Sequence, residues 1–266
     1  MVSMTAPVKL ADVNAIGFGA HLGNYLSSTD GATDLCLAID TAVQHLQALP
    51  LSPAQQGVLE GVGKSASDGF LLLGLPDAIT GSIKFYKQAS GLIELIREPG
   101  DDSKYGKVQG AAKGLLLQGA AVAYSSTKVA SLIQNKKWAD LNAPLISGVN
   151  NLSSLVMDSF DLFDQASKIY TIRQERAEAT QGQRQVAPEV VEREWICMVN
   201  LVKDVASVVL SVLILALLVF DVVAESVAIL PPTILALTTI YLTAKLYAYF
   251  YERLFEDARA EALALP

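Results

Sequence analysis

The tripeptide Gly63-Lys64-Ser65 is the stretch of this sequence closest to a chemical motif. It matches the end of the phosphate-binding pattern G-x-x-x-x-G-K-S/T, in which backbone amides and the lysine hold phosphate oxygens. The pattern needs a glycine at position 58, where the sequence has Val58, and a strand before the loop. A capping box at residues 52–55 instead predicts that a helix begins there. We therefore predict no nucleotide site.

A second glycine pattern combines Gly17 and Gly19 with Gly23, in the spacing G-x-G-x-x-x-G. Dinucleotide sites use G-x-G-x-x-G within a strand–helix–strand unit, and the surrounding sequence does not indicate such a unit. We interpret this segment as a flexible or closely packed turn.

Metal chemistry has few candidate residues. Asp158, Asp161 and Asp164 fall on one face of a predicted helix, where such a row can bind a cation but more commonly forms a solvated acidic stripe. His21 and His45 have no Cys, His or carboxylate neighbour at metal-ligand spacing. We favour the solvated stripe and predict no metal site.

The sequence also lacks the patterns of common hydrolases, since neither G-x-S-x-G nor H-E-x-x-H occurs. Its two cysteines, Cys36 and Cys197, are too few for a disulfide framework, and we expect them to act as small buried apolar residues. We predict no catalytic, cofactor-binding or metal-binding residues, no cofactor and no enzymatic activity. The net charge of −7 argues against nucleic acid as a partner.

The elements that surround these residues are unusually apolar. The 266 residues are 52% hydrophobic and 18% charged, whereas soluble domains are about 25% charged. Residues 205–220 form a run of sixteen uncharged residues, twelve of which are Val, Leu, Ile or Phe. As a helix the run spans about 24 Å, and its apolar flanks supply the rest of a roughly 30 Å hydrocarbon core. An insertion free energy of roughly −4 to −7 kcal/mol predicts a transmembrane helix.

A second apolar run covers residues 226–244 and is interrupted by Pro231-Pro232. Because proline is favoured in the first turn of a helix, we expect the second helix to begin near Pro232. Its threonines suit packing against the first helix, so the two runs predict a transmembrane hairpin. The alternative is a buried helical hairpin in the core of a soluble protein.

Aromatic and basic residues gather at one end of the predicted hairpin, as the membrane interface favours. The aromatic residues are Trp195, Tyr247, Tyr249 and Tyr251. The basic residues are Arg193, Lys203, Lys245 and Arg253. The turn at the other end contains Asp221 and Glu225 but neither Lys nor Arg, so the positive-inside rule predicts cytosolic termini.

The N-terminal three quarters predict helices and little strand. Residues 1–30 lack the basic and apolar regions of a signal peptide, and we expect a mobile segment there. Apolar residues at helical spacing predict helices over residues 35–46, from the capping box at residue 52, and between Pro76 and Pro99.

Residues 114–127 are uncharged but span only about 21 Å as a helix, which is too short to cross a bilayer. We predict a buried core helix, in which Gly110 and Gly114 suit close helix packing. A long helix through residues 152–169 is expected to lead into a polar linker.

These features together predict an all-α protein in which an N-terminal helical region precedes a C-terminal two-helix transmembrane hairpin. The expected parts are a mobile N-terminal segment at 1–30, a helical cytosol-facing region at 31–178, a polar linker at 179–190, the bilobed transmembrane hairpin at 191–251 and a short C-terminal tail at 252–266.

Two closely spaced hydrophobic lobes at 205–220 and 226–244, without a signal peptide, resemble the inclusion-membrane (Inc) proteins of chlamydiae. The layout is most similar to members in which a helical region rich in Ala, Ser and Gly precedes a C-terminal hydrophobic pair. Residues 63–68 and 172–179 look like counterparts of such regions. Many members instead have the lobes near the N-terminus.

This resemblance implies a type III secreted protein whose secretion signal lies in the N-terminal segment. The protein would be integral to the host vacuole (inclusion) membrane, with both termini cytosolic and residues 31–178 exposed to the cytosol. The expected partners are the lipid bilayer, host or bacterial proteins, and further copies of the chain in a homo-oligomer. We therefore expect a membrane-anchored host-interaction protein.

A weaker resemblance is to peroxin-11-type membrane proteins, which combine amphipathic helices with a C-terminal hydrophobic pair preceded by a Lys-Asp pair, here Lys203-Asp204. It implies a membrane-shaping or elongation function, in which amphipathic helices wedge into one leaflet. Another alternative is a small pore built from copies of the hairpin. Its water-lining residues would be Lys245, Thr238, Thr239 and Thr243.

Overall fold

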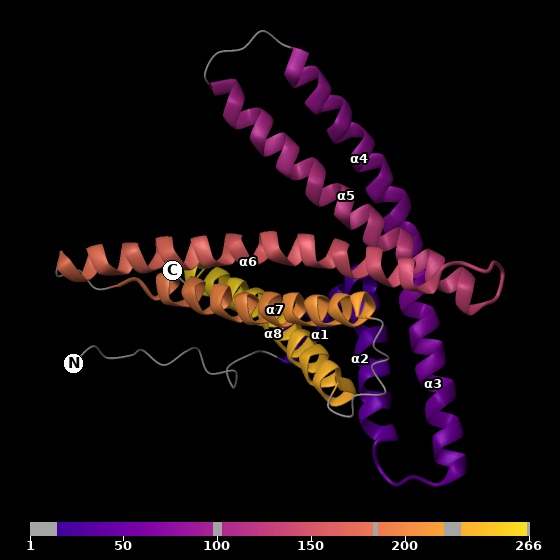
Figure 1. Cartoon of the computed structure of the whole chain (residues 1–266). Helices are drawn as coiled ribbons and strands as arrows, with labels where there is room; N and C mark the ends of the chain where they lie inside the picture. The colour runs from indigo at the N-terminus through magenta and orange to yellow at the C-terminus, as the bar shows by residue number, and fades with distance from the viewer. Residues whose placement is uncertain (1–14, 98–102, 183–185, 221–229, 265–266) are drawn as a thin grey trace.

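The computed structural model describes residues 15–97, 103–182, 186–220 and 230–264, which form α-helices and no strands (Figure 1). The prediction of an all-α fold is therefore confirmed. The last two helices are long and apolar enough, by length and composition, to form a C-terminal transmembrane hairpin. The helices are α1 (Ala15–Ser27), α2 (Thr29–Gln47), α3 (Pro53–Leu72), α4 (Gly74–Arg97), α5 (Ser103–Asn135), α6 (Ala143–Gln181), α7 (Pro188–Val219) and α8 (Leu230–Ala264).

Several helices begin at the signals that the sequence contains. The Ser52 side chain accepts a hydrogen bond from the amide of Gln55, and the Gln55 side chain accepts one from the amide of Ser52. The predicted capping box therefore begins α3. Ser28 and Asn142 cap α2 and α6, each accepting a hydrogen bond from an amide three residues later. Such caps satisfy backbone amides that have no partner within the helix.

Helices that follow one another in the chain pack side by side. The pairs are α2 with α3, α4 with α5, α5 with α6, α6 with α7, and α7 with α8 (Figure 1). α8 also contacts α1 and α2, so the two ends of the described chain lie together. α6 accompanies α7 along most of its length, from the Ser207–Asp158 hydrogen bond to the Arg173–Glu194 ion pair. One side of the hairpin is thus covered by α6 and α2.

Some segment boundaries differ from the predictions. The glycine pattern from Gly17 to Gly23 lies inside α1 instead of forming a turn, and residues 1–14 of the predicted mobile segment lie outside the described residues. α6 continues to Gln181 and α7 begins at Pro188, so the linker is shorter than 179–190. α8 extends to Ala264 through most of the predicted tail. The Ala, Glu, Arg and Gln residues of these polar stretches have high helix propensity, which explains the longer helices.

The uncharged segment 114–127 is part of α5 and is not a buried core helix, since most of it is half-buried and Leu116 is exposed. A Cβ atom added at Gly110 or Gly114 would meet nothing within 4 Å, so the predicted close packing at these glycines is wrong. Helices α4 and α5 approach closely elsewhere. A Cβ atom at Gly74 would lie 2.7 Å from Cβ of Lys128.

Gly31 allows the sharp corner between α1 and α2. A Cβ atom at this position would lie 1.9 Å from the carbonyl oxygen of Tyr25. The backbone must therefore move to relieve this clash. We expect Gly31→Ala to lower the free energy of unfolding by about 2–3 kcal/mol, as overpacking does. Chemical unfolding in detergent micelles, followed by circular dichroism, measures the effect.

The control for this prediction is Gly57→Ala in α3, where the added Cβ would meet nothing within 4 Å. Because alanine has a higher helix propensity than glycine, this change is expected to stabilise by up to about 1 kcal/mol. Equal effects of the two substitutions would contradict a steric role for Gly31.

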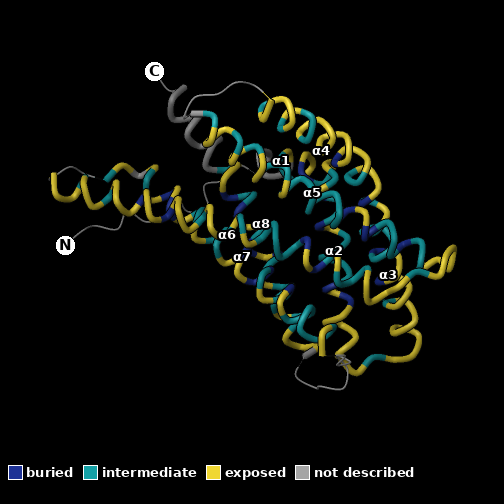
Figure 2. Tube along the Cα trace, turned by 45° about the horizontal axis from the view of Figure 1, so that its top comes forward, coloured by how far each residue is buried: buried dark blue, intermediate teal, exposed yellow. Residues whose placement is uncertain are grey.

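Several polar side chains are buried in this structure, while many large apolar side chains are exposed. Asp34, Lys128 and Ser211 are buried, whereas large apolar side chains such as Ile79 and Val205 are about half exposed. Figure 2 shows exposed positions along α3 and α4 and buried positions where helices meet. Single exposed apolar residues are ordinary, but here they form rows along α4, α6 and α7. Each candidate membrane span is only 17% buried, whereas the core helix of a soluble protein is mostly buried. The exposure of the hairpin thus disagrees with the soluble-core alternative.

Candidate functional site: a polar cavity behind an apolar face

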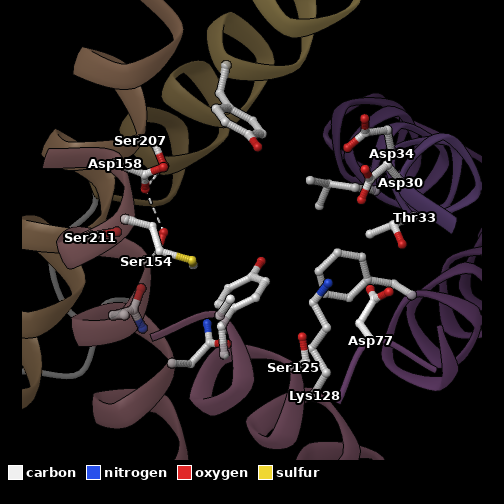
Figure 3. Close-up of a pocket in the computed structure, with 18 of the residues that line it drawn as sticks. Asp30, Thr33, Asp34, Asp77, Ser125, Lys128, Ser154, Asp158, Ser207 and Ser211 are labelled. Carbon is white, nitrogen blue, oxygen red and sulfur yellow. Dashed lines mark hydrogen bonds between the residues drawn. The ribbon is translucent and has the colours of Figure 1, made fainter. Parts of the chain in front are cut away.

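A cavity of about 580 Å³ lies between helices α2 to α8 (Figure 3). The described residues that line it include four aspartates and three lysines. Asp30, Asp34, Asp77 and Lys128 lie on one side of the cavity in Figure 3. Ser154, Asp158, Ser207 and Ser211 lie on the other. The cavity is therefore built jointly by the N-terminal helices and the hairpin.

Asp34 connects three helices at this cavity. Its side chain on α2 is 3% exposed, and it accepts a hydrogen bond from the hydroxyl of Tyr25 on α1. The ammonium of Lys245 on α8 lies 2.8 Å from the other carboxylate oxygen. Burial, followed by the Asp34 hydrogen bond, raises the pKa of the Tyr25 hydroxyl, which stays protonated as a donor. The interaction fixes α8 against the N-terminal helices.

Asp158 joins α6 to α7. The hydroxyls of Ser154 and Ser207 both donate to Asp158 Oδ2, at 2.7 and 2.6 Å. The prediction of a solvated acidic stripe is therefore wrong for Asp158, because α7 packs against this position. It holds for Asp164, which is exposed and pairs with Lys168 at 2.7 Å. Asp161 is exposed too, yet partial desolvation raises the pKa of its carboxyl.

Lys128 on α5 is 6% exposed and lines the cavity. Its ammonium lies over the rings of Phe70 and Tyr124, at 4.3 and 4.7 Å from their centroids. No carboxylate among the described residues forms an ion pair with it. Burial lowers the pKa of the Lys128 ammonium, and the nearby charge of Asp77 partly opposes that effect. Cation–π contacts are thus the main support for this buried charge.

The described residues that line the cavity do not form a recognisable catalytic arrangement. Neither histidine nor cysteine is among the described residues that line it, so its serines lack a neighbouring imidazole base. In the described part of the chain, no three His, Cys, Asp or Glu side chains group in a way that could hold a metal ion. The hydroxyls and paired charges instead bind helices to one another.

Helix α7 divides cleanly into a polar and an apolar side. Asp204, Ser207 and Ser211 are buried, and Asp204 is fully inaccessible. The ammonium of Lys203 lies 3.0 Å from Asp204 Oδ1, but neither carboxylate oxygen of Asp204 accepts a hydrogen bond from a described residue. On the opposite side Val205 and neighbouring valines are exposed. The polar side of α7 thus faces the protein interior.

Aromatic residues meet at one end of the hairpin, as the sequence predicts. The indole of Trp195 donates a hydrogen bond of 3.2 Å to the hydroxyl of Tyr247, which links α7 to α8. The rings of Tyr247 and Tyr251 stack with centroids 5.4 Å apart. Tyr249 instead contacts Tyr25 of α1, with centroids 4.3 Å apart. Part of the predicted aromatic belt therefore packs against the protein.

Gly63-Lys64-Ser65 and His45 lie away from this cavity, whereas Asp158 of the aspartate row lines it. Gly63 packs against Val43 of α2, where an added Cβ would lie 3.0 Å from the valine, while Lys64 and Ser65 are exposed within α3. Gly63-Lys64-Ser65 is therefore a helix-packing segment. Nε2 of His45 lies 3.0 Å from Oγ1 of Thr239 on α8.

The two cysteines are half-buried and unpaired with each other, as free thiols. Burial raises the pKa of the Cys36 thiol, which agrees with a packing role. His21 is exposed to an intermediate degree on α1. The cavity residues Asp34 and Lys128 were not predicted from the sequence, because each is an ordinary charged residue until the fold buries it.

Comparisons with known proteins give no functional lead: no protein-family model, curated protein or solved structure matches this chain.

Proposed function

We propose that this chain is a membrane-anchored interaction protein, with the α7–α8 hairpin in the bilayer and the preceding helices presented to partner proteins. By resemblance to inclusion-membrane proteins, the proposed membrane is that of a host vacuole, with both termini cytosolic. The proposed partners are host or bacterial proteins and further copies of this chain.

The observation that carries the proposal is the inverted polarity of α7. Ionisable residues within membrane-spanning helices face the protein interior, because hydrocarbon solvates them poorly. Asp204 is fully buried, while Val205 and Val209 on the opposite side are each 45% exposed. In water this arrangement would expose a long apolar row to the solvent, and no interaction would offset the free-energy cost of that exposure. In a bilayer the same row contacts acyl chains and favours insertion.

Helix α6 supports the proposal because, where it lies beside α7, it too has a polar inner side and an apolar outer side. Ser154 and Asp158 line the cavity, whereas Leu145, Val149 and Leu152 are exposed. The polar groups of this half of α6 are therefore screened by α7.

The proposed surface for partner proteins is the outer side of α4. Four of the apolar residues that make this helix amphipathic, Ile79, Ile83, Tyr86 and Ile93, are each at least half exposed. α5 packs against the other side of α4. A row of exposed apolar residues at helical spacing is typical of a helix that docks in a partner's groove.

The alternative functions receive less support. Lys245 pairs with Asp34, and Thr239 contacts His45, so two residues proposed to line a pore have partners within their own chain. The exposed apolar row of α4 is also compatible with membrane shaping. Purified protein that elongates liposomes would favour that function over partner binding.

Protease protection on intact vacuoles tests the proposed topology. We expect added protease to cut within residues 31–178 and at the C-terminus, because both would be cytosolic. The segment at residues 221–229 is expected to be resistant until detergent opens the membrane. Shielding of residues 31–178 together with cleavage of that segment would contradict the proposal.

A further inference from the structure

A single row of apolar residues runs along the outer side of α7. We call this row of exposed or half-buried apolar residues the valine seam. It consists of Val202, Val205, Val209, Val212, Ala216 and Val219. They follow one another in alternating steps of three and four, and exposed Met198 and Trp195 continue that spacing toward the N-terminus. This is the heptad spacing of a helix that winds around a second helix.

The residue types on α7 also differ between the valine seam and the rest of the helix. Between residues 201 and 219 each leucine lies off the valine seam, and five of the six seam positions are valine. Leucine and valine enter lipid about equally well, so contact with acyl chains alone does not separate them. Valine has one dominant rotamer in a helix and a short side chain, which reduce the entropy lost on packing and allow close approach.

We propose that the valine seam is a homodimer interface, in which α7 packs in parallel against α7 of a second copy. The inference rests on the proposed membrane anchoring, because insertion in one direction places both copies of α7 in the same orientation. A seam that faces its own copy forms a two-fold, self-complementary interface.

The available area is sufficient for a second copy. From Val191 to Val219 the outer side of α7 is about 42 Å long at 1.5 Å per residue. On α8 the exposed residues Ala236, Ile240, Thr243 and Tyr247 add about 17 Å of neighbouring helix. With helices about 10 Å wide, each copy offers roughly 600 Å². Two copies would bury about 1,200 Å², the lower end of the range for stable specific interfaces.

Disulfide cross-linking in membranes tests the interface. The full-length chain, with Cys36→Ala and Cys197→Ala, is placed in phosphatidylcholine vesicles with one new cysteine. The seam variants are Val202→Cys, Val205→Cys, Val209→Cys and Val212→Cys. The controls are Leu210→Cys and Ile214→Cys, which line the cavity on the opposite side. We expect disulfide dimers from the seam variants alone, since cysteines with Cα atoms more than about 7 Å apart do not form a bridge.

A shape variant of the seam provides the second measurement. Val205→Leu with Val209→Leu preserves lipophilicity but changes the packing surface, so we expect reduced cross-linking at Val202→Cys and unchanged recovery with the vesicles. Equal cross-linking at seam and control positions, or none, in protein that floats with the vesicles would overturn the interface alone. Protein that does not float with the vesicles would instead overturn the proposed anchoring.

Discussion

Replacing both Val205 and Val209 with arginine is expected to release the protein from the membrane fraction. Arginine costs about 3 kcal/mol at the centre of a membrane helix and less toward its ends, so Val209→Arg costs more than Val205→Arg, which lies at the first position of the run. The same scale gives residues 205–220 roughly −4 to −7 kcal/mol of insertion free energy, which the two arginines offset in large part. The measurement is the fraction of full-length chain that floats with vesicles on a density gradient.

The matched control is Val205→Leu with Val209→Leu, which leaves the apolar side of α7 intact and is expected to float like the unchanged chain. Both valines are 45% exposed, so the arginines do not enter the packed interior. Circular dichroism checks that helix content is retained. Undiminished flotation of the arginine variant would contradict insertion of α7 into the bilayer.

Replacing Lys245 with methionine is expected to destabilise the fold far more than the same replacement of the surface residue Lys168. Asp34 is 3% exposed and would lose its cation, which leaves a buried charge with only the hydroxyl of Tyr25 as donor. Breaking a buried pair in this way costs about 3–5 kcal/mol. At the lower value, about 3 kcal/mol, we expect the Tm in detergent micelles to fall by roughly 6–12 °C.

A second substitution separates the charge effect from lost packing. Adding Asp34→Asn to Lys245→Met removes the buried charge while the amide oxygen can still accept from Tyr25, so the double variant should regain much of the lost stability. Lys168→Met provides the surface control, because the Lys168–Asp164 pair is about half exposed and worth about 0.5 kcal/mol. If the double variant is as unstable as Lys245→Met alone, the ion pair is not the cause.

The fold could be predicted largely from local signals. The capping box at Ser52 and the apolar run at 205–220 each determine structure through neighbouring residues: the first begins α3, and the second lies in a helix long and apolar enough to span a membrane. Boundaries such as the end of α6 at Gln181 were less accurate, because a polar stretch with high helix propensity can form either a linker or a helix. The direction in which an amphipathic helix faces was also not determined by its own sequence.

The cavity could not be predicted in the same way. Asp34 and Lys245 are more than two hundred positions apart in the sequence, and the contact of α8 with α2 brings them together. Lys128 gains its importance from burial between Phe70 and Tyr124, which lie on different helices. One signal was available: a lysine within an apolar run indicates a residue that faces the interior and pairs there. Lys245 fits that rule.

The most direct test of the membrane anchoring is alkaline extraction of membranes that contain the full-length chain. Carbonate at high pH removes proteins held by charge or by partner proteins, while proteins embedded in the bilayer stay with the lipid. We predict that the chain remains in the pellet after high-speed centrifugation and enters the supernatant only when detergent is added. Recovery of the chain as a monomer in the detergent-free supernatant would contradict the account.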